Sequence, residues 1–493
     1  MASQDPIVFN NTFARMPEHF FSLQLPTPVS KPALLAVNHA LAKTLGIDPD
    51  WLGSPEGVAT VAGNSVPAGA EPLASVYAGH QFGSYNPQLG DGRAILLGEV
   101  STASGQRYDI QLKGSGPTPY SRGGDGRSPL GPVLREYIVS EAMYALGVPT
   151  TRALAAVTTG DQVVRETFQP GAVLARVASS HIRVGTFQYF GAQKNIDALR
   201  TLVSYTLQRH FPDAQNSGND AQALLRCVIQ AQAELIAHWQ LLGFVHGVMN
   251  TDNMLLCGET VDYGPCAFME SFHPDTVFSS IDQGRRYAYR NQPGIAQWNL
   301  ACLAQAVLPV LADNEEAAVA IAQEAVDQYP GLFMEAHNRG LSRKLGLIEA
   351  TDTDTALIED LFSLMAEAKA DFTLTFRYLA DLAAPGSDSA KVDKLYTPPE
   401  SLAPWLARWH ERVAMDEVSP VDRQKSMYRA NPVFIPRNHL VAHAISAAEA
   451  GDLEPFRALV ARTAQPFNYD EADQLLATPA QAGEEVRQTF CGT

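Results

Sequence analysis

The sequence predicts an α+β fold with two lobes, of which the first is rich in β-strands and the second is largely helical with extensions. Between residues 76 and 175, short runs of β-forming residues alternate with glycine-rich turns. Beyond about residue 185, apolar residues recur at helical spacing, and a polar motif follows one long predicted helix. We therefore expect an N-terminal extension over residues 1–75, a β-rich lobe over 76–180, and a helical lobe with a C-terminal extension over 181–493.

The first lobe is predicted to be a small sheet with one helix. Residues 1–75 hold several prolines and indicate mostly loop, with a helix near residues 33–45. Alternating aliphatic and polar residues predict strands, and helical spacing that ends at Gly147 predicts a helix among them. The expected strands cover residues 94–100, 108–113, 163–167 and 171–177, and the helix covers 134–146.

The second lobe is predicted from a long amphipathic helix over residues 224–242, which Gly243 ends. Further helices are expected over residues 315–328, 356–370 and 440–462. A β-rich part, then a helical part with a polar motif just after a long helix, is the element order of a two-lobed protein kinase.

Composition narrows the class of protein. The chain has 493 residues, of which 46% are hydrophobic and 18% charged, as in an ordinary folded protein. Its formal net charge of −17 disfavours a nucleic-acid partner, because phosphate neutralisation needs a basic surface. The five cysteines are scattered without zinc spacing, which indicates reduced thiols.

The N-terminal residues lack the pattern of a secretory signal. The nearest approach to a membrane span is the apolar run over residues 300–312, which predicts a buried helix. We therefore expect a cytoplasmic protein that acts without a membrane.

The most informative motif starts at His246 and reads HGVMNTDN, and Asp262-Tyr263-Gly264 follows it. Protein kinases read HRDLxxxN and then DFG, in which the Asn and the second Asp hold Mg²⁺ and the first Asp is the base. Here Asn253 and Asp262 occupy the metal positions, whereas Val248 occupies the position of the base. The motif predicts a kinase-like site for a nucleotide and Mg²⁺, or Mn²⁺ in its place.

Asp252 is the only carboxylate in the HGVMNTDN motif. Because Val248 cannot accept a proton and a positioned carboxylate can, we interpret Asp252 as the general base. A loop-capping residue or an additional metal contact is the alternative. His246 and His181 are predicted to be structural.

Cationic side chains are expected around the nucleotide. Lys113 ends a predicted strand, as the phosphate-binding lysine of kinases does, and Glu136 on the next helix is its candidate partner. Arg176 and Arg183, near the junction of the lobes, could bind phosphates with two hydrogen bonds each. Each of these four side chains, taken alone, would also be consistent with an ordinary solvent-exposed position.

Two glycine-rich segments could bring backbone N–H groups close to an anion, because glycine has no Cβ to obstruct the approach. The longer segment covers residues 114–127, and the order of a P-loop is absent from it. The shorter segment is Gly90-Asp91-Gly92-Arg93, which is equally consistent with a loop over the nucleotide and with a hairpin turn.

Taken together, these residues resemble the selenoprotein O family, which are kinase-like protein adenylyltransferases. The match extends over roughly residues 88 to 300, and its combination of motifs is far more specific than any single glycine motif. The matching segments are residues 88–93, 111–116, 124–127, 246–254, 262–265, 291–293 and 298–300.

The resemblance implies an enzyme that binds ATP in a flipped orientation and transfers AMP to Ser, Thr or Tyr hydroxyls of proteins. It implies that Asp252 is the proton acceptor, that Asn253 and Asp262 hold Mg²⁺, and that Glu136 orients Lys113. The residues implied in binding the nucleotide are Gly90, Gly92, Arg93, Lys113, Asp125, Gly126, Arg176, Arg183 and Asp262.

Some members of the family carry a selenocysteine near the C-terminus, and Cys491 occupies a similar place here. By this resemblance Cys491 could form a redox-sensitive disulfide, with Cys266 as its candidate partner. A free thiol on a frayed tail is the alternative.

Two other functions fit the same motif. The first is an ordinary phosphotransferase that moves the γ-phosphate with Asp252 as a substitute base. The second is a non-catalytic, nucleotide-binding and redox-sensing pseudokinase, which would explain the Val248 side chain at the position of the base.

Overall fold

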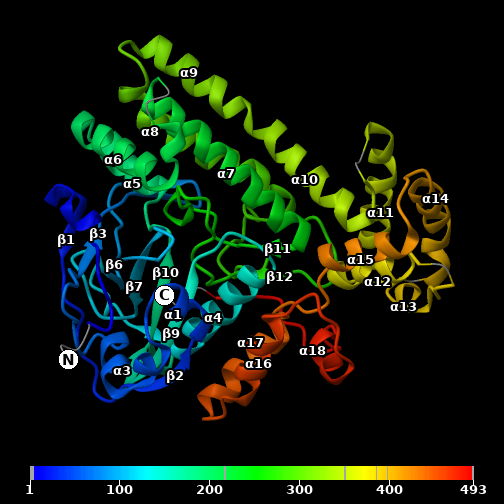
Figure 1. The fold of residues 1–493 in the computed structure, drawn as a ribbon, viewed down its shortest axis with the longest axis horizontal. Coiled ribbons are helices and arrows are strands. Elements are labelled where there is room, and N and C mark those ends of the chain that lie inside the picture. The colour runs from blue at the N-terminus through cyan, green and yellow to red at the C-terminus, as the bar shows by residue number, and fades with distance from the viewer. Residues whose placement is uncertain (1–4, 216–217, 349–350, 385, 397, 491–493) are drawn as a thin grey trace.

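The structure is a computed structural model, and it describes residues 5–215, 218–348, 351–384, 386–396 and 398–490. Figure 1 shows a β-sheet at one end of the molecule, a layer of long helices beside it, and a further helical group at the other end. The predicted α+β class with a β-rich first lobe and a helical second lobe is confirmed.

The first lobe is built on an eight-stranded antiparallel sheet with the order β1-β3-β6-β7-β10-β9-β2, and β8 pairs with β10 beside this path. The predicted strands near residues 94 and 108 are confirmed as β6 and β7, which pair as neighbours. The strands are β1 (Phe21–Leu23), β2 (Ala33–Val37), β3 (Leu73–Ser75), β6 (Ala94–Ser101), β7 (Arg107–Lys113), β8 (Ser128–Pro129), β9 (Arg152–Val164) and β10 (Phe168–Ala178).

The helix predicted over residues 33–45 is wrong in its first half. Residues 33–37 form β2, which pairs with β9, and only His39–Thr44 form a helix, α1. The apolar run ALLAV fits a strand or a helix by pattern alone, and the free edge of β9 decides the outcome. Asn38 begins α1 by accepting a hydrogen bond from the Leu41 N–H.

The strand predicted over residues 163–167 is also wrong. Residues 163 and 164 end the long strand β9, and residues 165–167 form the turn into β10. Two further short helices, α2 (Pro49–Gly53) and α3 (Pro55–Val61), cover one face of the sheet together with α1.

The opposite face of the sheet carries α4 (Leu130–Ala145), which begins four residues before its predicted start. Its buried side chains pack against β9 and β10 and against two C-terminal helices, α16 (Asn438–Glu449) and α17 (Glu454–Thr463). The single helix predicted over residues 440–462 is therefore wrong. Gly451, with φ 95°, and Pro455 at the start of α17 break it into two.

The second lobe is held together by α7 (Asp220–Leu242), which confirms the predicted long helix. Gly243 ends α7 in the left-handed conformation. The predicted helices near residues 315 and 356 are also confirmed. The neighbouring helices are α5 (Val184–Ala192), α6 (Ile196–His210), α8 (Gln292–Leu311), α9 (Glu315–Asp327) and α10 (Tyr329–Leu345).

A separate apolar core holds the last group of helices, at the far end of the molecule from the sheet (Figure 1). Its large buried side chains include Trp405 and Trp409, whose rings stack. The helices are α11 (Thr355–Ala368), α12 (Phe372–Asp381), α13 (Ala390–Asp393), α14 (Ala403–Ala414) and α15 (Pro420–Ala430), and α18 (Gln474–Ala477) follows later in the chain.

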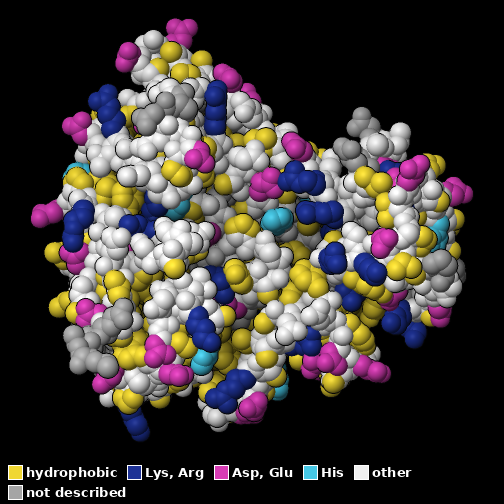
Figure 2. Space-filling view, in the orientation of Figure 1, with side chains coloured by type: hydrophobic (Ala, Val, Ile, Leu, Met, Phe, Trp, Pro, Cys, Tyr) yellow, Lys and Arg dark blue, Asp and Glu magenta, His cyan; other side chains and the backbone are white. Residues whose placement is uncertain are grey.

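One helical stretch among the described residues, Tyr289–Leu311, is long and apolar enough to cross a membrane by length and composition. Half of its apolar window is buried, and Leu300, Leu303 and Val307 belong to the main core of the helical lobe. The core helix of a protein can be as long and as apolar as a membrane span. The burial of these side chains agrees with the buried helix predicted over residues 300–312. On the face shown in Figure 2, acidic and basic side chains are interspersed.

His210, at the end of α6, should make stability depend on pH. Burial, followed by the nearby Arg209 charge, lowers the pKa of His210 to about 3. Between pH 4 and 6.5 the unfolded chain therefore binds a proton that the folded chain does not, so the free energy of unfolding should fall as the pH falls.

His210→Gln keeps a polar group near Ser180 and removes the titration. We expect it to flatten the loss of stability between pH 7 and 4.5 by about 2 to 3 kcal/mol, measured by urea denaturation. The same substitution at the exposed His443 is the control. Equal pH dependence in the two variants would contradict the prediction.

Candidate nucleotide-binding site

A cavity of about 730 Å³ lies between the two lobes. Both lobes contribute to its wall, and the predicted site residues converge on it from separate segments of the chain. The predicted residues that line it are Gly90, Gly92, Arg93, Lys113, Asp125, Gly126, Arg176, Arg183, Asp252, Asn253 and Asp262.

The pairing of β7 with β10 explains how the cations of the first lobe reach the cavity. Arg176 in β10 lies opposite Gln111 in β7, and Lys113 is two residues further along β7. Side chains two residues apart in a strand, and those directly opposite across a pair, project from the same face of a sheet. Lys113 and Arg176 therefore both point toward α4, which carries Glu136.

Glu136 is the partner of both cations. Its side chain is 3% exposed, with one carboxylate oxygen 2.5 Å from the Lys113 Nζ and the other 3.1 Å from the Arg176 Nη1. Burial alone would favour the protonated acid, but Lys113 and Arg176 together lower the pKa of Glu136. The ion pair predicted between Lys113 and Glu136 is present, and Arg176 is an additional member.

Arg183 connects the two lobes. It begins α5, and its guanidinium lies 4.5 Å from the centre of the Tyr77 ring. Its Nη1 donates to the main-chain oxygen of Asp252 at 2.8 Å, and its Nη2 is 3.4 Å from Asp91 Oδ1. The guanidinium is thus fixed between the glycine turn of the first lobe and the motif of the second.

Close packing within the first lobe requires glycine at the two turns that line the cavity. Gly90 has φ 80°, and a Cβ there would lie 2.4 Å from the Tyr120 ring. Gly126 has φ 64°, and a Cβ would meet the main chain of Gly116 at 2.1 Å. Asp125, which also lines the cavity, forms an ion pair with Arg165. Both turns leave main-chain atoms next to the cavity.

The HGVMNTDN motif is anchored by its first residue, His246, which is fully buried and stacks on Trp239. The His246 Nε2 is 2.9 Å from the Val261 oxygen, and its Nδ1 is 3.3 Å from the Val248 N–H. This requires a neutral ring with the proton on Nε2, and burial lowers the pKa of His246 accordingly. His246 thereby ties the motif to the segment that leads to Asp262.

Asp252 lies in a short 3₁₀ turn, Thr251–Asn253, at the wall of the cavity, and the residue is 7% exposed. Burial raises the pKa of Asp252 to about 6, while Arg183 and a hydrogen bond from Gln81 act in the opposite direction. Gln81 Nε2 donates to Asp252 Oδ2 at 3.1 Å. A carboxylate whose proton affinity is raised in this way is suited to accept a proton.

Asn253 and Asp262 fit a divalent cation by the chemistry of their oxygen atoms. The Asn253 Nδ2 donates to the Val248 oxygen at 3.1 Å, which leaves the amide oxygen for a ligand. Burial opposes ionisation of Asp262, but Lys113, Arg93 and Arg176 hold its pKa well below the usual range. Among the described residues, no group of three or more His, Cys, Asp or Glu side chains could hold a metal alone. A cation here would need oxygen atoms from a nucleotide as well, as Mg²⁺ sites commonly do.

Cys266 is buried, and burial raises its pKa to about 12. The C-terminal segment lies beside it, because the Thr489 Oγ1 donates to the Pro265 oxygen at 2.6 Å. Cys491 lies outside the described residues.

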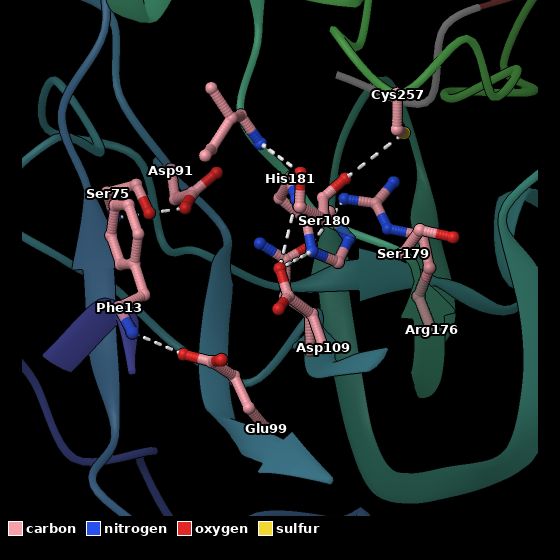
Figure 3. A network of polar contacts seen from close by, with 12 residues as sticks. Phe13, Ser75, Asp91, Glu99, Asp109, Arg176, Ser179, Ser180, His181 and Cys257 are labelled. Atoms are coloured by element: carbon pink, nitrogen blue, oxygen red, sulfur yellow. Dashed lines mark hydrogen bonds and ion pairs between the residues drawn. The ribbon is translucent and has the colours of Figure 1, made fainter. Parts of the chain in front are cut away.

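A buried polar network lies among the strands of the first lobe (Figure 3). Asp109 in β7 accepts hydrogen bonds from the His181 N–H at 2.9 Å and the Arg209 Nη2 at 2.5 Å, and Glu99 accepts one from the Phe13 N–H. Asp91 accepts one from the Ser75 N–H at 3.0 Å. The network joins β6, β7 and α6, and it accounts for His181 as a structural residue.

Several residues at the site are not among those predicted. Tyr77 and Asp91 hold Arg183, Gln81 contacts Asp252, and Arg127 and Arg165 line the outer part of the cavity. Asp91 could have been recognised from its place in the turn at residues 90–93. Gln81 carries no signal in the sequence, because its partner is 171 residues away.

The two lobes, the Lys113–Glu136 pair and the cavity between the glycine turns and Asp262 define a kinase-like nucleotide-binding protein. A family model described as protein adenylyltransferase SelO matches residues 6–464. The chain belongs to this family.

Relatives of nearly the same length carry one name, protein nucleotidyltransferase YdiU. The protein from Rhodopseudomonas palustris (strain BisB18) is 54% identical over 486 residues, which cover 98% of this chain and 99% of the relative. The protein from Nitrobacter hamburgensis is 53% identical over 490 residues, which cover 99% and 97%.

Replacing Glu136 by Gln should leave Lys113 and Arg176 close together without the buried carboxylate that they share, and with Asp262, 3.5 Å from Lys113, as a nearby negative charge. We expect Glu136→Gln to lower the free energy of unfolding by about 3 kcal/mol, measured by urea denaturation. Glu234→Gln, which removes an exposed pair with Arg339, is the matched control and should change it by less than about 0.5 kcal/mol. Equal effects of the two substitutions would show that the shared carboxylate stabilises the fold no more than an exposed ion pair does.

Proposed function

We propose that this protein transfers AMP from ATP to the hydroxyl group of a Ser, Thr or Tyr side chain of another protein. The observation that carries the proposal is the place of Asp252. It is a buried carboxylate at the wall of the cavity, next to the candidate metal ligand Asn253, in a motif whose usual base position holds Val248. Membership of the SelO family supports AMP as the transferred group.

The step balances as a substitution at the α-phosphorus. The acceptor oxygen forms a bond to the α-phosphorus, the bond from that phosphorus to the α–β bridging oxygen breaks, and pyrophosphate leaves. The hydroxyl proton passes to the Asp252 carboxylate. Negative charge on the phosphate oxygens and on the leaving group has to be stabilised, which is a role for fixed cations.

Lys113, Arg176 and Arg183 are the cations that would contact the phosphates. Glu136 fixes the first two, and Tyr77 with Asp91 fixes the third, so little reorganisation is needed when ATP binds. Arg93, Asp125 and the main chain at Gly90, Gly92 and Gly126 would complete the nucleotide site. ATP therefore meets charges that are already in place.

Asn253 and Asp262 would hold Mg²⁺, or Mn²⁺ in its place, together with phosphate oxygens. Such an ion polarises the phosphate and neutralises part of its charge. Lys113, 3.5 Å from Asp262 Oδ1, keeps the Asp262 carboxylate ionised and oriented for this role.

The transferred group can be identified by labelling. The protein is incubated with Mg-ATP and a bacterial protein extract as the source of acceptors, with the label on either the α- or the γ-phosphate. We expect label in protein only from the α-phosphate, and labelled pyrophosphate from the γ-phosphate. Protein labelling only from the γ-phosphate would identify a phosphotransferase, and labelling from neither would identify a non-catalytic nucleotide-binding protein.

Asp252→Asn preserves the shape of the side chain and removes its ability to accept a proton. We expect the maximal rate of AMP transfer to fall by about 100-fold or more, with the affinity for ATP changed little. Asp197→Asn, on the exposed side of α6, is the control. An Asp252→Asn variant that keeps most of its rate would rule out Asp252 as the base.

A further inference from the structure

Resting on the proposed function, we propose that the hairpin of β4 (Gly79–Gln81) and β5 (Ser84–Asn86) positions Asp252 for catalysis, through Gln81 and Thr251. This small two-stranded sheet is separate from the main sheet, and nothing in the kinase-like motifs points to it. Gln81 and Thr251 would act through Asp252 and would be positioning residues.

Three consecutive residues of the hairpin bind three consecutive residues of the motif. The His80 N–H donates to the Thr251 Oγ1 at 2.7 Å, Gln81 Nε2 donates to Asp252 Oδ2 at 3.1 Å, and the Phe82 N–H donates to the Asn250 Oδ1 at 3.1 Å. Three contacts fix the orientation of residues 250–252 of the motif, which a single contact would not do.

Thr251 is the centre of a closed set of hydrogen bonds. Its hydroxyl accepts from the His80 N–H and donates to the Gln188 Oε1 at 2.6 Å. The Gln188 Nε2 in turn lies 2.8 Å from the His80 Nδ1. Thr251 is fully buried and Gln188 nearly so, which means that loss of the hydroxyl would leave buried groups without partners.

The contact with Gly79 sets the distance between the hairpin and the Asp252 side chain. A Cβ on Gly79 would lie 2.7 Å from Asp252 Oδ1, so only glycine permits this approach. Asp252 Oδ1 is buried against Gly79 and has no hydrogen-bond partner among the described residues, whereas Oδ2 is the oxygen that Gln81 holds. Gln81 itself lines the nucleotide cavity.

These contacts assign different tasks to the two carboxylate oxygens. The contact of Oδ1 with Gly79 limits how closely the Asp252 side chain can approach the hairpin. Oδ2 is the oxygen that Gln81 holds, and an acceptor hydroxyl would approach this same oxygen. A carboxylate oxygen accepts more than one hydrogen bond, so Gln81 orients Oδ2 and leaves a lone pair for the acceptor proton. A displacement of about 1 Å in such a group can lower a rate about 100-fold.

The test compares the maximal rate of transfer of α-labelled AMP to a protein extract, the KM for ATP, and the melting temperature of each variant. Gln81→Met keeps the length of the side chain and removes the donor. Thr251→Val removes the hydroxyl at nearly constant shape, and Thr251→Ser restores it. Gln106→Met, in the exposed turn between β6 and β7, is the matched control.

We expect Gln81→Met and Thr251→Val to lower the maximal rate by about 10- to 100-fold with the KM for ATP changed by less than about threefold, whereas Thr251→Ser keeps most of the rate. Unchanged rates in Gln81→Met would overturn the proposal, as would a rate loss in Thr251→Ser equal to that in Thr251→Val. Because Gln81 lies at the cavity wall, its variant tests the proposal even where Thr251→Val fails to fold. Absence of AMP transfer by the unaltered protein would instead refute the proposed function.

Discussion

The site depends on one buried carboxylate, Glu136, shared by two cations of the first lobe. Lys113 and Arg176 come from neighbouring strands and would repel each other in a poorly hydrated space. Glu136 holds each through a different oxygen, at 2.5 and 3.1 Å, and so makes their approach possible. Because α4 carries Glu136 and also contacts α16 and α17, the C-terminal helices stabilise the helix that fixes Lys113 and Arg176.

Most of the cations at the cavity come from the first lobe. The first lobe presents Lys113, Arg176 and Arg93, and the second presents Asp252, Asn253 and Asp262. Arg183 spans the boundary, since its guanidinium contacts Asp91 in the first lobe and the Asp252 main chain in the second. A triphosphate with a divalent cation matches this separation, with its anionic oxygens toward the cations and its metal toward the oxygen ligands.

Local patterns predicted the parts of the structure that depend on local sequence. Strands β6 and β7 and helix α7 have clear periodicity, and the HGVMNTDN motif places Asn253 and Asp262 at familiar spacings. The helix predicted over residues 33–37 is wrong because the run ALLAV fits a strand or a helix, and pairing with β9 decides between them. The break at Gly451 was not predicted because the apolar spacing continues through it. In the structure, two short helices, α16 and α17, pack on α4 there.

Gln81 shows a deeper reason why sequence alone is insufficient. A kinase motif fixes the base by its position within the motif, and here that position holds Val248. Asp252, the proposed substitute, lies in a short 3₁₀ turn, and its burial disfavours the charged form of its carboxylate. Fixed partners must therefore come from elsewhere in the fold. The hairpin of β4 and β5 supplies them from 171 residues upstream. On the proposed function, the base lies four residues beyond its position in kinases, and the contacts that hold it come from an element that kinase motifs do not encode.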